Sequence, residues 1–393
     1  MAELAGDYQN AVPFGQLGIL PLPGTEALAG RIDDYIVQWR REYAAKLPED
    51  DILHRYVKDS YIIDCSFPRF GTGEGKAMIG HSVRGYDLFL LCDCFNYGVE
   101  YEMYGKRFPT SPDEHFANLK RAISAAGGKE RRLTVIMPML YEGRQHRRSG
   151  RESLDCAMAL QELERLGVKN IITFDAHDAR VQNAIPHCGF ENVPCTYQMI
   201  KALTNTVPDL NIHKDHLMVI SPDEGGMARS IFYSNMLGVD LGMFYKRRDY
   251  SVIKGGRNPI IAHEFLGDNV AGKDVIVVDD MISSGDSVLD VATRLKELGA
   301  ERVFFCIAFG LFSAGFAHID AAYNAGIFDK IFTGNMVYTP PELREKPWHV
   351  SVNMSKYISY IIDTINHDMS LSGVLTPRDR IQHLLIEKGY RLG

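Results

Sequence analysis

The chain has 393 residues, of which 46% are hydrophobic and 24% charged, so it is an ordinary globular protein with room for two domains. Its formal net charge of -7 argues against a nucleic-acid partner or a membrane surface, because both usually require a basic face. The sequence shows no signal-peptide pattern and no membrane-spanning apolar run, and its seven scattered cysteines suit a reduced, cytoplasmic protein.

Apolar patterning predicts strands that alternate with helices after an irregular leader over residues 1–17. In chain order, strands are expected at 18–22, 61–65, 87–92, 133–137, 170–174, 216–220, 241–245, 274–278 and 302–309. Amphipathic helices are expected over 24–46, 113–126 and 154–166. This alternation predicts mainly parallel sheets with helices on both faces, the α/β class.

The strand-helix pattern runs through twice, which predicts two similar α/β domains. We expect an N-terminal domain over 18–194 and a C-terminal domain over 195–345, connected by a segment rich in Pro, Cys and Asn at 186–208. The remaining residues, 346–393, are expected to form a helix and a tail that pack back on the N-terminal domain.

Polar side chains follow several predicted strands, and the carboxyl ends of such strands are where open α/β sheets bind ligands. Asp175-Ala176-His177 follows one strand, and Ser221-Pro222-Asp223-Glu224-Gly225-Gly226 follows another. The second string offers carboxylates for a metal and glycines that let backbone amides approach phosphate oxygens. Simpler interpretations remain open, because His177 would also suit a buried or capping position and the glycine turn would also suit a helix cap.

The string Val275–Val288 is the most informative part of the sequence. An apolar strand ends there in Asp279 and Asp280, and a loop of serines and glycine leads into a helix. Backbone N–H groups at a helix N-terminus favour a phosphate, and two carboxylates suit ribose hydroxyls or a magnesium ion. The whole string therefore predicts a sugar-phosphate cradle, although an acid pair alone would also serve as a helix cap.

Positive charge is local. It gathers in Lys246-Arg247-Arg248, after the strand at 241–245, and around Arg144, where Arg147, Arg148 and Arg151 follow. Such clusters suit small anionic substrates, and a solvated surface run is the alternative interpretation.

These strings, in this order, resemble the ribose-phosphate pyrophosphokinases, also called phosphoribosyl pyrophosphate (PRPP) synthetases. The cradle alone is similar to the PRPP-binding loop that these enzymes share with type I phosphoribosyltransferases. Three further strings resemble the N-terminal half of the family: Arg69-Phe70-Gly71-Thr72-Gly73-Glu74, Val83-Arg84-Gly85-Tyr86-Asp87-Leu88-Phe89 and Arg144-Gln145. The resemblance covers residues 18–377 and implies two phosphoribosyltransferase-like domains.

The resemblance also implies a reaction, the transfer of the diphosphoryl group of ATP to the C1 hydroxyl of ribose 5-phosphate, with Mg2+ as cofactor. It places ribose 5-phosphate on Asp279, Asp280, Ser283, Ser284, Gly285, Asp286 and Ser287. It places ATP on Phe70, Thr72, Glu74, Arg144, Gln145, Asp223, Glu224, Gly225 and Gly226. It further implies Lys246 and Arg248 as catalytic residues below a lid at 249–258, a metal held by His177 and Asp223, and a homo-oligomer, hexameric or dimer-based, whose subunits share the adenine site.

The sequence departs from the family pattern at particular positions. Thr72 and His146 stand where the family has aspartates, Asp178 begins a string that differs after His177, and an additional helix is expected near 42–57. Two rival functions remain, a type I phosphoribosyltransferase and a regulatory paralogue without catalysis. The transferase would not need Phe70 or Arg144-Gln145, and a silent paralogue would be expected to have lost parts of the site.

Overall fold

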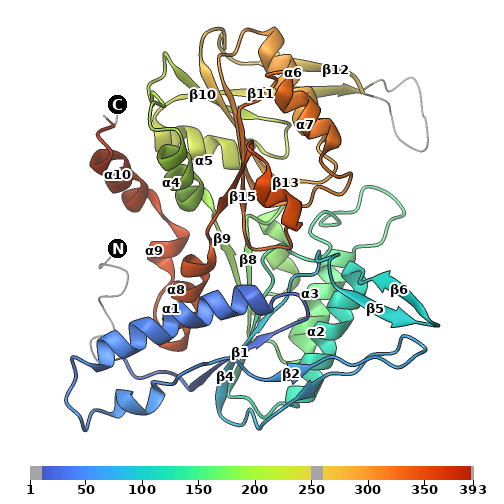
Figure 1. Ribbon diagram of the computed structural model, residues 1–393, viewed down its shortest axis with the longest axis vertical. Coiled ribbons are helices and arrows are strands. Elements are labelled where there is room, and N and C mark those ends of the chain that lie inside the picture. Colours follow the sequence, from blue (N-terminus) through green and yellow to red (C-terminus); the bar gives the residue numbers. More distant parts are fainter. Residues whose placement is uncertain (1–10, 249–259, 391–393) are drawn as a thin grey trace. The chain divides into compact units, whose positions relative to one another are not determined.

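The computed structural model describes residues 11–248 and 260–390, which form two compact units (Figure 1). The first unit runs to Pro194 and also takes in Asn335–Tyr338 and Asn353–Leu375. The second comprises Cys195–Gly334, Thr339–Val352 and Thr376–Gly393. Each unit is described by itself.

The first unit is built on a five-stranded parallel sheet in the order β1-β4-β7-β8-β9. The strands are β1 (Gln16–Pro21), β4 (Tyr86–Leu91), β7 (Arg132–Ile136), β8 (Asn170–Phe174) and β9 (Gly189–Val193). The residues of β1, β4, β7 and β8 are almost continuously buried, as expected when helices cover both faces, whereas only Val193 is buried in the edge strand β9. The strands expected at 18–22, 87–92, 133–137 and 170–174 are thereby confirmed within one or two residues.

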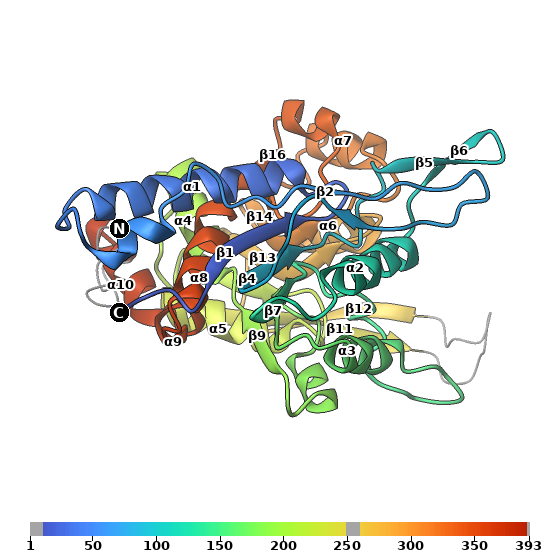
Figure 2. The ribbon, with the colours of Figure 1, turned by 90° about the horizontal axis from the view of Figure 1, so that it is seen from below.

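Helices α1 (Glu26–Ala44) and α8 (Ser355–Asn366) cover one face of this sheet, and α2 (Pro112–Ala126) and α3 (Asp155–Arg165) cover the other (Figure 2). The start of α2 follows from its sequence. The Ser111 hydroxyl accepts from the backbone N–H of Glu114 at 3.3 Å, and the Glu114 carboxylate accepts from that of Ser111 at 2.9 Å. The helix ends at Gly127, whose φ of 66° suits glycine.

Three expectations for the first unit were wrong. Residues 61–65 form no regular strand. Tyr61 and Ile63 each share one backbone hydrogen bond with Ile19, which makes an isolated bridge. The short β2 (Cys65–Ser66) pairs instead with β3 (Met78–Ile79). The additional helix near 42–57 is the end of α1 followed by the 3-10 helix η2 (Ile52–Tyr56), since Pro48 cannot continue a helix. The segment 186–208 is not a simple connection but carries β9 and α4 (Thr196–Thr206).

The second unit has a seven-stranded sheet in the order β12-β11-β10-β13-β14-β15-β16, in which only β12 is antiparallel to its neighbour. Its strands are β10 (Leu217–Ser221), β11 (Asp240–Arg248), β12 (Ile260–Leu266), β13 (Asp274–Ile282), β14 (Val303–Gly310), β15 (Lys330–Gly334) and β16 (His349–Val352). Its helices are α4, α5 (Met227–Leu237), α6 (Asp286–Glu297), α7 (Ala317–Asn324) and α10 (Arg378–Glu387). The predicted α/β class with two similar sheet-and-helix units is confirmed.

The C-terminal part differs from its expected arrangement. Strand β16 joins the sheet of the second unit, and only α8 and the short α9 (Ser372–Leu375) belong to the first. Helix α10 packs on α4, where Lys388 donates to the Asn205 side chain at 2.6 Å and Arg380 lies 4.4 Å from the centre of the Tyr197 ring. The remaining short elements are the hairpin β5 (Glu100–Met103) and β6 (Lys106–Pro109), and the 3-10 helices η3 (Ala179–Ala184) and η4 (Pro341–Glu345).

Candidate active site

The predicted cradle lies in the second unit between β13 and α6. The sequence predicted that the strand ends before Asp279 and Asp280. In the structure β13 continues to Ile282, so both acids lie inside the strand. The reason is β14, which pairs with β13 as far as Ile282, whereas the partner β10 ends opposite Val277. The acid pair therefore sits where β13 has lost one neighbour.

The loop Ser283–Gly285 is held tightly by the surrounding backbone. His318 Nε2 donates to the Ser284 carbonyl oxygen at 2.9 Å, and the Ser313 N–H donates to the Ser283 carbonyl at the same distance. Gly285 has a φ of 102°, and an added Cβ would stand 3.0 Å from His318 Nε2. Glycine is therefore required here, and the loop presents the N-terminus of α6 in a fixed shape.

The side chains of the cradle differ in exposure. Ser283 and Ser284 are half-buried, while Asp286 and Ser287, on the first turn of α6, are exposed. The Ser284 hydroxyl donates to the Asp286 carboxylate at 2.8 Å. The loop thus offers hydroxyl and backbone donors on a half-open surface, the arrangement that suits a phosphate.

Asp279 and Asp280 place two carboxylates beside each other at this edge. Asp280 is buried, and Asp279 is half-exposed. Burial, with the charge of Asp280 beside it, raises the pKa of Asp279, and Arg229 of α5 opposes this from 3.7 Å. Such crowded negative charge would be relieved by a cation or by hydroxyl donors.

The Asp223–Gly226 turn lies next to this pair. The Asp223 carboxylate accepts from the backbone N–H groups of Gly225 at 2.9 Å and Gly226 at 3.2 Å. An added Cβ on Gly226 would stand 3.5 Å from the Val278 carbonyl oxygen of β13. The structure therefore brings the turn and the cradle together, and Asp223 bonds amides of its own turn, while the N-cap residue of α5, Gly226, has no side-chain cap.

Lys246 and Arg248 lie at the end of β11, whose backbone pairs with β12. The expected lid at 249–258 lies outside the described residues.

In the first unit, the loop Arg69–Glu74 closes on itself. The Phe70 N–H donates to the Glu74 carbonyl and the Gly73 N–H to the Phe70 carbonyl, both at 2.8 Å. The Thr72 hydroxyl donates to the Glu74 carboxylate, also at 2.8 Å. The Phe70 ring is 56% exposed, so the loop presents an aromatic surface to a ligand from outside.

The residues around Arg144 and His177 form a second group in the first unit. Arg144 is exposed, and the Gln145 amide donates to the Ser153 carbonyl at 2.8 Å, within its own loop. The rings of His146 and His177 lie 5.3 Å apart between centres, and His146 Nε2 is 3.5 Å from an Asp178 carboxylate oxygen. Hydrogen bonds from Arg180 lower the pKa of Asp178 to about 2.

One of these contacts joins two residues that depart from the family pattern, because His146 lies 3.5 Å from Asp178 and both replace other residue types. Sequence reasoning recorded both positions but did not pair them. It also did not foresee the roles of Arg229 and His318. Arg229 could have been found from its position one turn after Gly225 and Gly226. His318 is far from the cradle in the sequence, so no local pattern pointed to it.

The side chains that could ligate the expected Mg2+ are few. Within residues 11–248 and 260–390, no group of three or more His, Cys, Asp or Glu side chains is arranged to hold a metal ion. Magnesium prefers few carboxylates together with water and phosphate oxygens, which fits Asp279 and Asp280 better than the exposed His177. His177 and Asp223, the expected metal pair, belong to different units.

Known proteins resemble both units. Residues 19–167 match the N-terminal domain of ribose phosphate pyrophosphokinase, and residues 196–319 match the phosphoribosyl transferase domain, so the two matches together span more than half of the chain. A ribose-phosphate pyrophosphokinase of Vibrio parahaemolyticus is 27% identical over 317 residues, covering 79% of this chain and 90% of that protein. A ribose-phosphate pyrophosphokinase of Prochlorococcus marinus is also 27% identical, over 78% of this chain and 84% of its own length.

A solved structure is similar as well. The phosphoribosylpyrophosphate synthetase from Mycobacterium smegmatis gives a TM-score of 0.70 at 18% identity, covering 90% of this chain and 99% of that chain. At this identity, the likeness concerns the fold. None of the helices in the described ranges has the length and apolar character that crossing a membrane requires.

Proposed function

The chain belongs to the ribose-phosphate pyrophosphokinase family, and from that premise we propose that it transfers the β,γ-diphosphoryl group of ATP to the C1 hydroxyl of ribose 5-phosphate. The products are PRPP and AMP. The observation that carries the proposal is the cradle, in which a glycine-dependent loop at the start of α6 stands beside the carboxylates of Asp279 and Asp280.

In this proposal, the cradle binds the sugar. The 5-phosphate accepts from the backbone N–H groups at the start of α6 and from the hydroxyls of Ser283, Ser284 and Ser287. Asp279 and Asp280 accept from ribose hydroxyls and so fix the ring with its C1 hydroxyl facing ATP. Because the loop is held by His318 and Ser313, it needs little rearrangement on binding.

Transfer itself needs positioning and charge neutralisation more than covalent chemistry. The C1 oxygen attacks the β-phosphorus, the bond from that phosphorus to the oxygen of the α-phosphate breaks, and the hydroxyl proton leaves to solvent or a nearby base. Lys246 and Arg248 neutralise the charge that develops on the transferring group. Bound magnesium, held by Asp279, Asp280 or Asp223 together with phosphate oxygens, would neutralise phosphate charge.

In the first unit, Phe70 is proposed to stack on adenine, Thr72 and Glu74 to bond its edge, and Arg144 and Gln145 to contact the nucleotide. In the second unit, the amides of Gly225 and Gly226 can donate to phosphates once the Asp223 carboxylate releases them. We propose that Phe70 serves the site of a neighbouring subunit in a homo-oligomer, because its ring is 56% exposed.

The seven free thiols, all in the described ranges, suit a reducing compartment such as the cytoplasm.

The direct test uses the purified protein with ATP, ribose 5-phosphate and magnesium, beside a reaction with PRPP and nucleobases. AMP that forms only when ribose 5-phosphate is present supports the proposal. PRPP loss that depends on a base would make the protein a phosphoribosyltransferase, and inactivity in both reactions would make it a regulatory paralogue. Lys246→Ala and Arg248→Ala should lower turnover about a hundredfold or more with the fold intact.

A further inference from the structure

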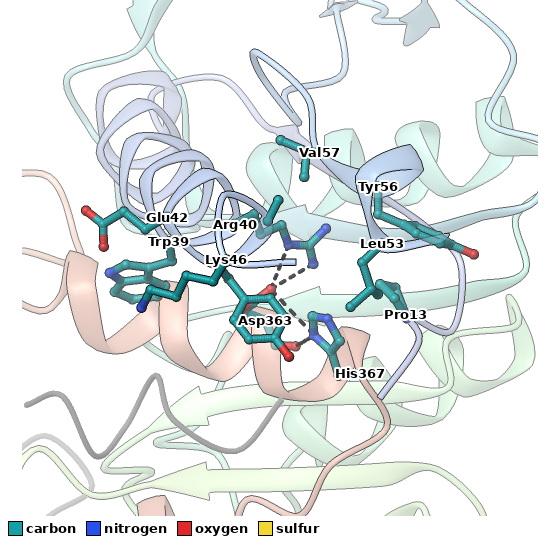
Figure 3. Close-up of a pocket in the computed structure, with 12 residues that line it drawn as sticks. Pro13, Trp39, Arg40, Glu42, Lys46, Leu53, Tyr56, Val57, Asp363 and His367 are labelled. Carbon is teal, nitrogen blue, oxygen red and sulfur yellow. Dashed lines mark hydrogen bonds and ion pairs between the residues drawn. The ribbon is translucent and has the colours of Figure 1, made fainter. Parts of the chain in front are cut away.

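A pocket of about 90 Å³ lies in the first unit, far along the chain from the strings discussed so far (Figure 3). Its walls come from the C-terminal end of α1, from η2 and from the end of α8. Most lining side chains are aromatic or aliphatic: Trp39, Tyr43, Leu53, Tyr56, Val57 and Pro13. The segment after α1, for which the sequence gave no role, thus supplies one wall.

This pocket is separate from the residues proposed to bind ATP in the same unit. Asn366, at the end of α8, donates to the Gly15 carbonyl at 3.3 Å and to the Asp87 carboxylate at 2.8 Å, near the amino ends of β1 and β4. His177 follows the carboxyl end of β8. Since the strands are parallel, the pocket and His177 lie at opposite edges of the sheet.

Arg40 is the polar feature of the pocket. Its side chain is buried, and its Nε and Nη2 donate to one Asp363 carboxylate oxygen at 2.9 and 2.7 Å. Nη2 also donates to the Asn366 side chain at 2.6 Å. Its Nη1 is buried as well, as is the Asp363 Oδ2 oxygen, and neither atom has a hydrogen-bond partner in the described part of the chain. The Arg40 guanidinium carbon lies 4.8 Å from the centre of the Tyr61 ring.

Figure 3 shows that the remaining guanidinium nitrogen of Arg40, Nη1, points away from Asp363. A buried N–H donor without an acceptor costs about 1 to 3 kcal/mol, so an acceptor placed in the pocket would be stabilising. Arg40 is already neutralised by Asp363, and Lys46 and Glu42, both at the pocket, have opposite charges. Burial lowers the pKa of His367, which favours its uncharged form.

The charges at the pocket therefore nearly balance, and its walls are flat or aliphatic. A charged ligand would gain little from Arg40, because Asp363 already neutralises it. We propose that this pocket binds a small uncharged heteroaromatic molecule with a carbonyl or ring-nitrogen acceptor, the chemical class of the nucleobases. The acceptor bonds Arg40 Nη1, and the ring packs among Trp39, Leu53 and Tyr56.

The test is titration calorimetry with hypoxanthine, which is uncharged near neutral pH and has such acceptors. Indole is the matched probe, because it has a similar flat shape and a donor but no acceptor. Hypoxanthine should bind the full-length protein, and indole should bind at least about tenfold more weakly.

Two neighbouring substitutions on η2 locate the binding. Leu53→Trp fills the pocket and should weaken hypoxanthine binding at least about tenfold. Ile52→Trp is the control, since Ile52 is 50% exposed and does not line the pocket, and it should leave the affinity unchanged. If Leu53→Trp fails to fold by circular dichroism, Val57→Phe replaces it.

Phe70→Ala separates this pocket from the proposed adenine site and should keep full hypoxanthine binding. The proposal is overturned if hypoxanthine does not bind, if it binds the pocket-filling variant as tightly as the natural protein, or if Phe70→Ala abolishes binding. Equal binding of indole overturns the role of the acceptor. These outcomes do not depend on whether the protein makes PRPP.

Discussion

In both units an Asp–Arg ion pair joins the amino ends of neighbouring parallel strands. At the carboxyl ends of the strands the two units differ. In the first, Asp87 of β4 accepts from Nε and Nη2 of Arg132 at 2.8 and 2.7 Å. In the second, Asp274 of β13 accepts from Nε and Nη2 of Arg302 at 2.9 and 2.7 Å. Both pairs join the starts of adjacent parallel strands, so this edge is scaffold in both units.

The carboxyl edges have diverged. The second unit builds its cradle from a single strand-loop-helix string with little side-chain freedom. The first unit presents Phe70 and Arg144 on exposed loops that hydrogen-bond mainly within themselves. In the proposed function, sugar-phosphate binding by the second unit therefore depends on backbone shape, whereas base binding by the first unit depends on individual side chains.

The scaffold pairs should give the largest effects on stability. Asp87→Ala leaves the largely buried Arg132 without its bidentate partner, which should lower the free energy of unfolding by about 3 to 5 kcal/mol. Asp274→Ala should cost less, because the Arg302 side chain is 28% exposed and that of Arg132 14%, while each arginine keeps a second carboxylate partner, Asp209 or Asp368. Calorimetric unfolding of both variants checks this, and equal losses would contradict the ranking.

The loop glycines test whether backbone shape matters more in the second unit. Gly285→Ala forces a residue with a Cβ into a φ of 102° against His318 and should lower kcat/KM for ribose 5-phosphate about a hundredfold. Gly73→Ala, with a φ of 93°, meets the end of the flexible Met103 side chain, which can move aside. It should change kcat/KM for ATP by less than about tenfold.

Steady-state kinetics with both substrates provide the check for the two glycine variants. Gly315→Ala is a matched control, because Gly315 also has a positive φ but an added Cβ would meet nothing within 4 Å. If Gly73→Ala proved more damaging than Gly285→Ala, the contrast between the two regions would be lost.

A buried carboxyl in the first unit should respond to pH. Burial raises the pKa of Asp93 to about 6, although its carboxylate accepts from the Tyr338 N–H at 2.6 Å and from the Phe95 N–H at 3.0 Å. An unfolded aspartate titrates near pH 4, so between about pH 4 and 6 Asp93 holds a proton in the folded protein and loses it on unfolding. The contribution of Asp93 to stability should therefore be greatest below about pH 4 and fall by about 2 to 3 kcal/mol as the pH rises past 6.

Thermal unfolding of the first unit across this range measures the slope. Asp93→Asn cannot ionise and should flatten it. An unchanged slope in that variant would assign the effect to another group.

The exposed aromatic ring should affect nucleotide binding but not stability. Phe70→Ala should raise KM for ATP at least about tenfold, since base stacking on an aromatic ring is worth about 1 to 3 kcal/mol. Thermal stability should not change, because the ring is 56% exposed. Phe70→Trp should restore the affinity, and a KM unaffected by Phe70→Ala would remove this residue from the nucleotide site.

The sequence predicted most in the places where structure is local. The sequence predicted β1, β4, β7, β8, β10, β11, β13, β14 and the cradle string, because burial, glycine and acid spacing are local patterns of a few residues, but it did not predict β9 or β12. The continuation of β13 past Val278 could not be predicted, because it depends on β14. Strands β15 and β16 and the docking of α10 on α4 depend likewise on pairing and packing across long chain separations.

The site was predictable to a similar degree. Asp279 and Ser283 were found from their string, but the support from His318 and the contact of His146 with Asp178 come from tertiary structure. The Arg40 pocket had no local signal, since it needs α1 and α8 together.

The central claim is transfer of a diphosphoryl group onto ribose held by the second unit. The most direct measurement follows ATP and ribose 5-phosphate by phosphorus NMR in the presence of magnesium. We predict that the α-phosphorus appears only in AMP, while the β- and γ-phosphorus signals move together onto C1 of the sugar. ADP formation with transfer of the γ-phosphorus alone, or no transfer to ribose, would contradict the account.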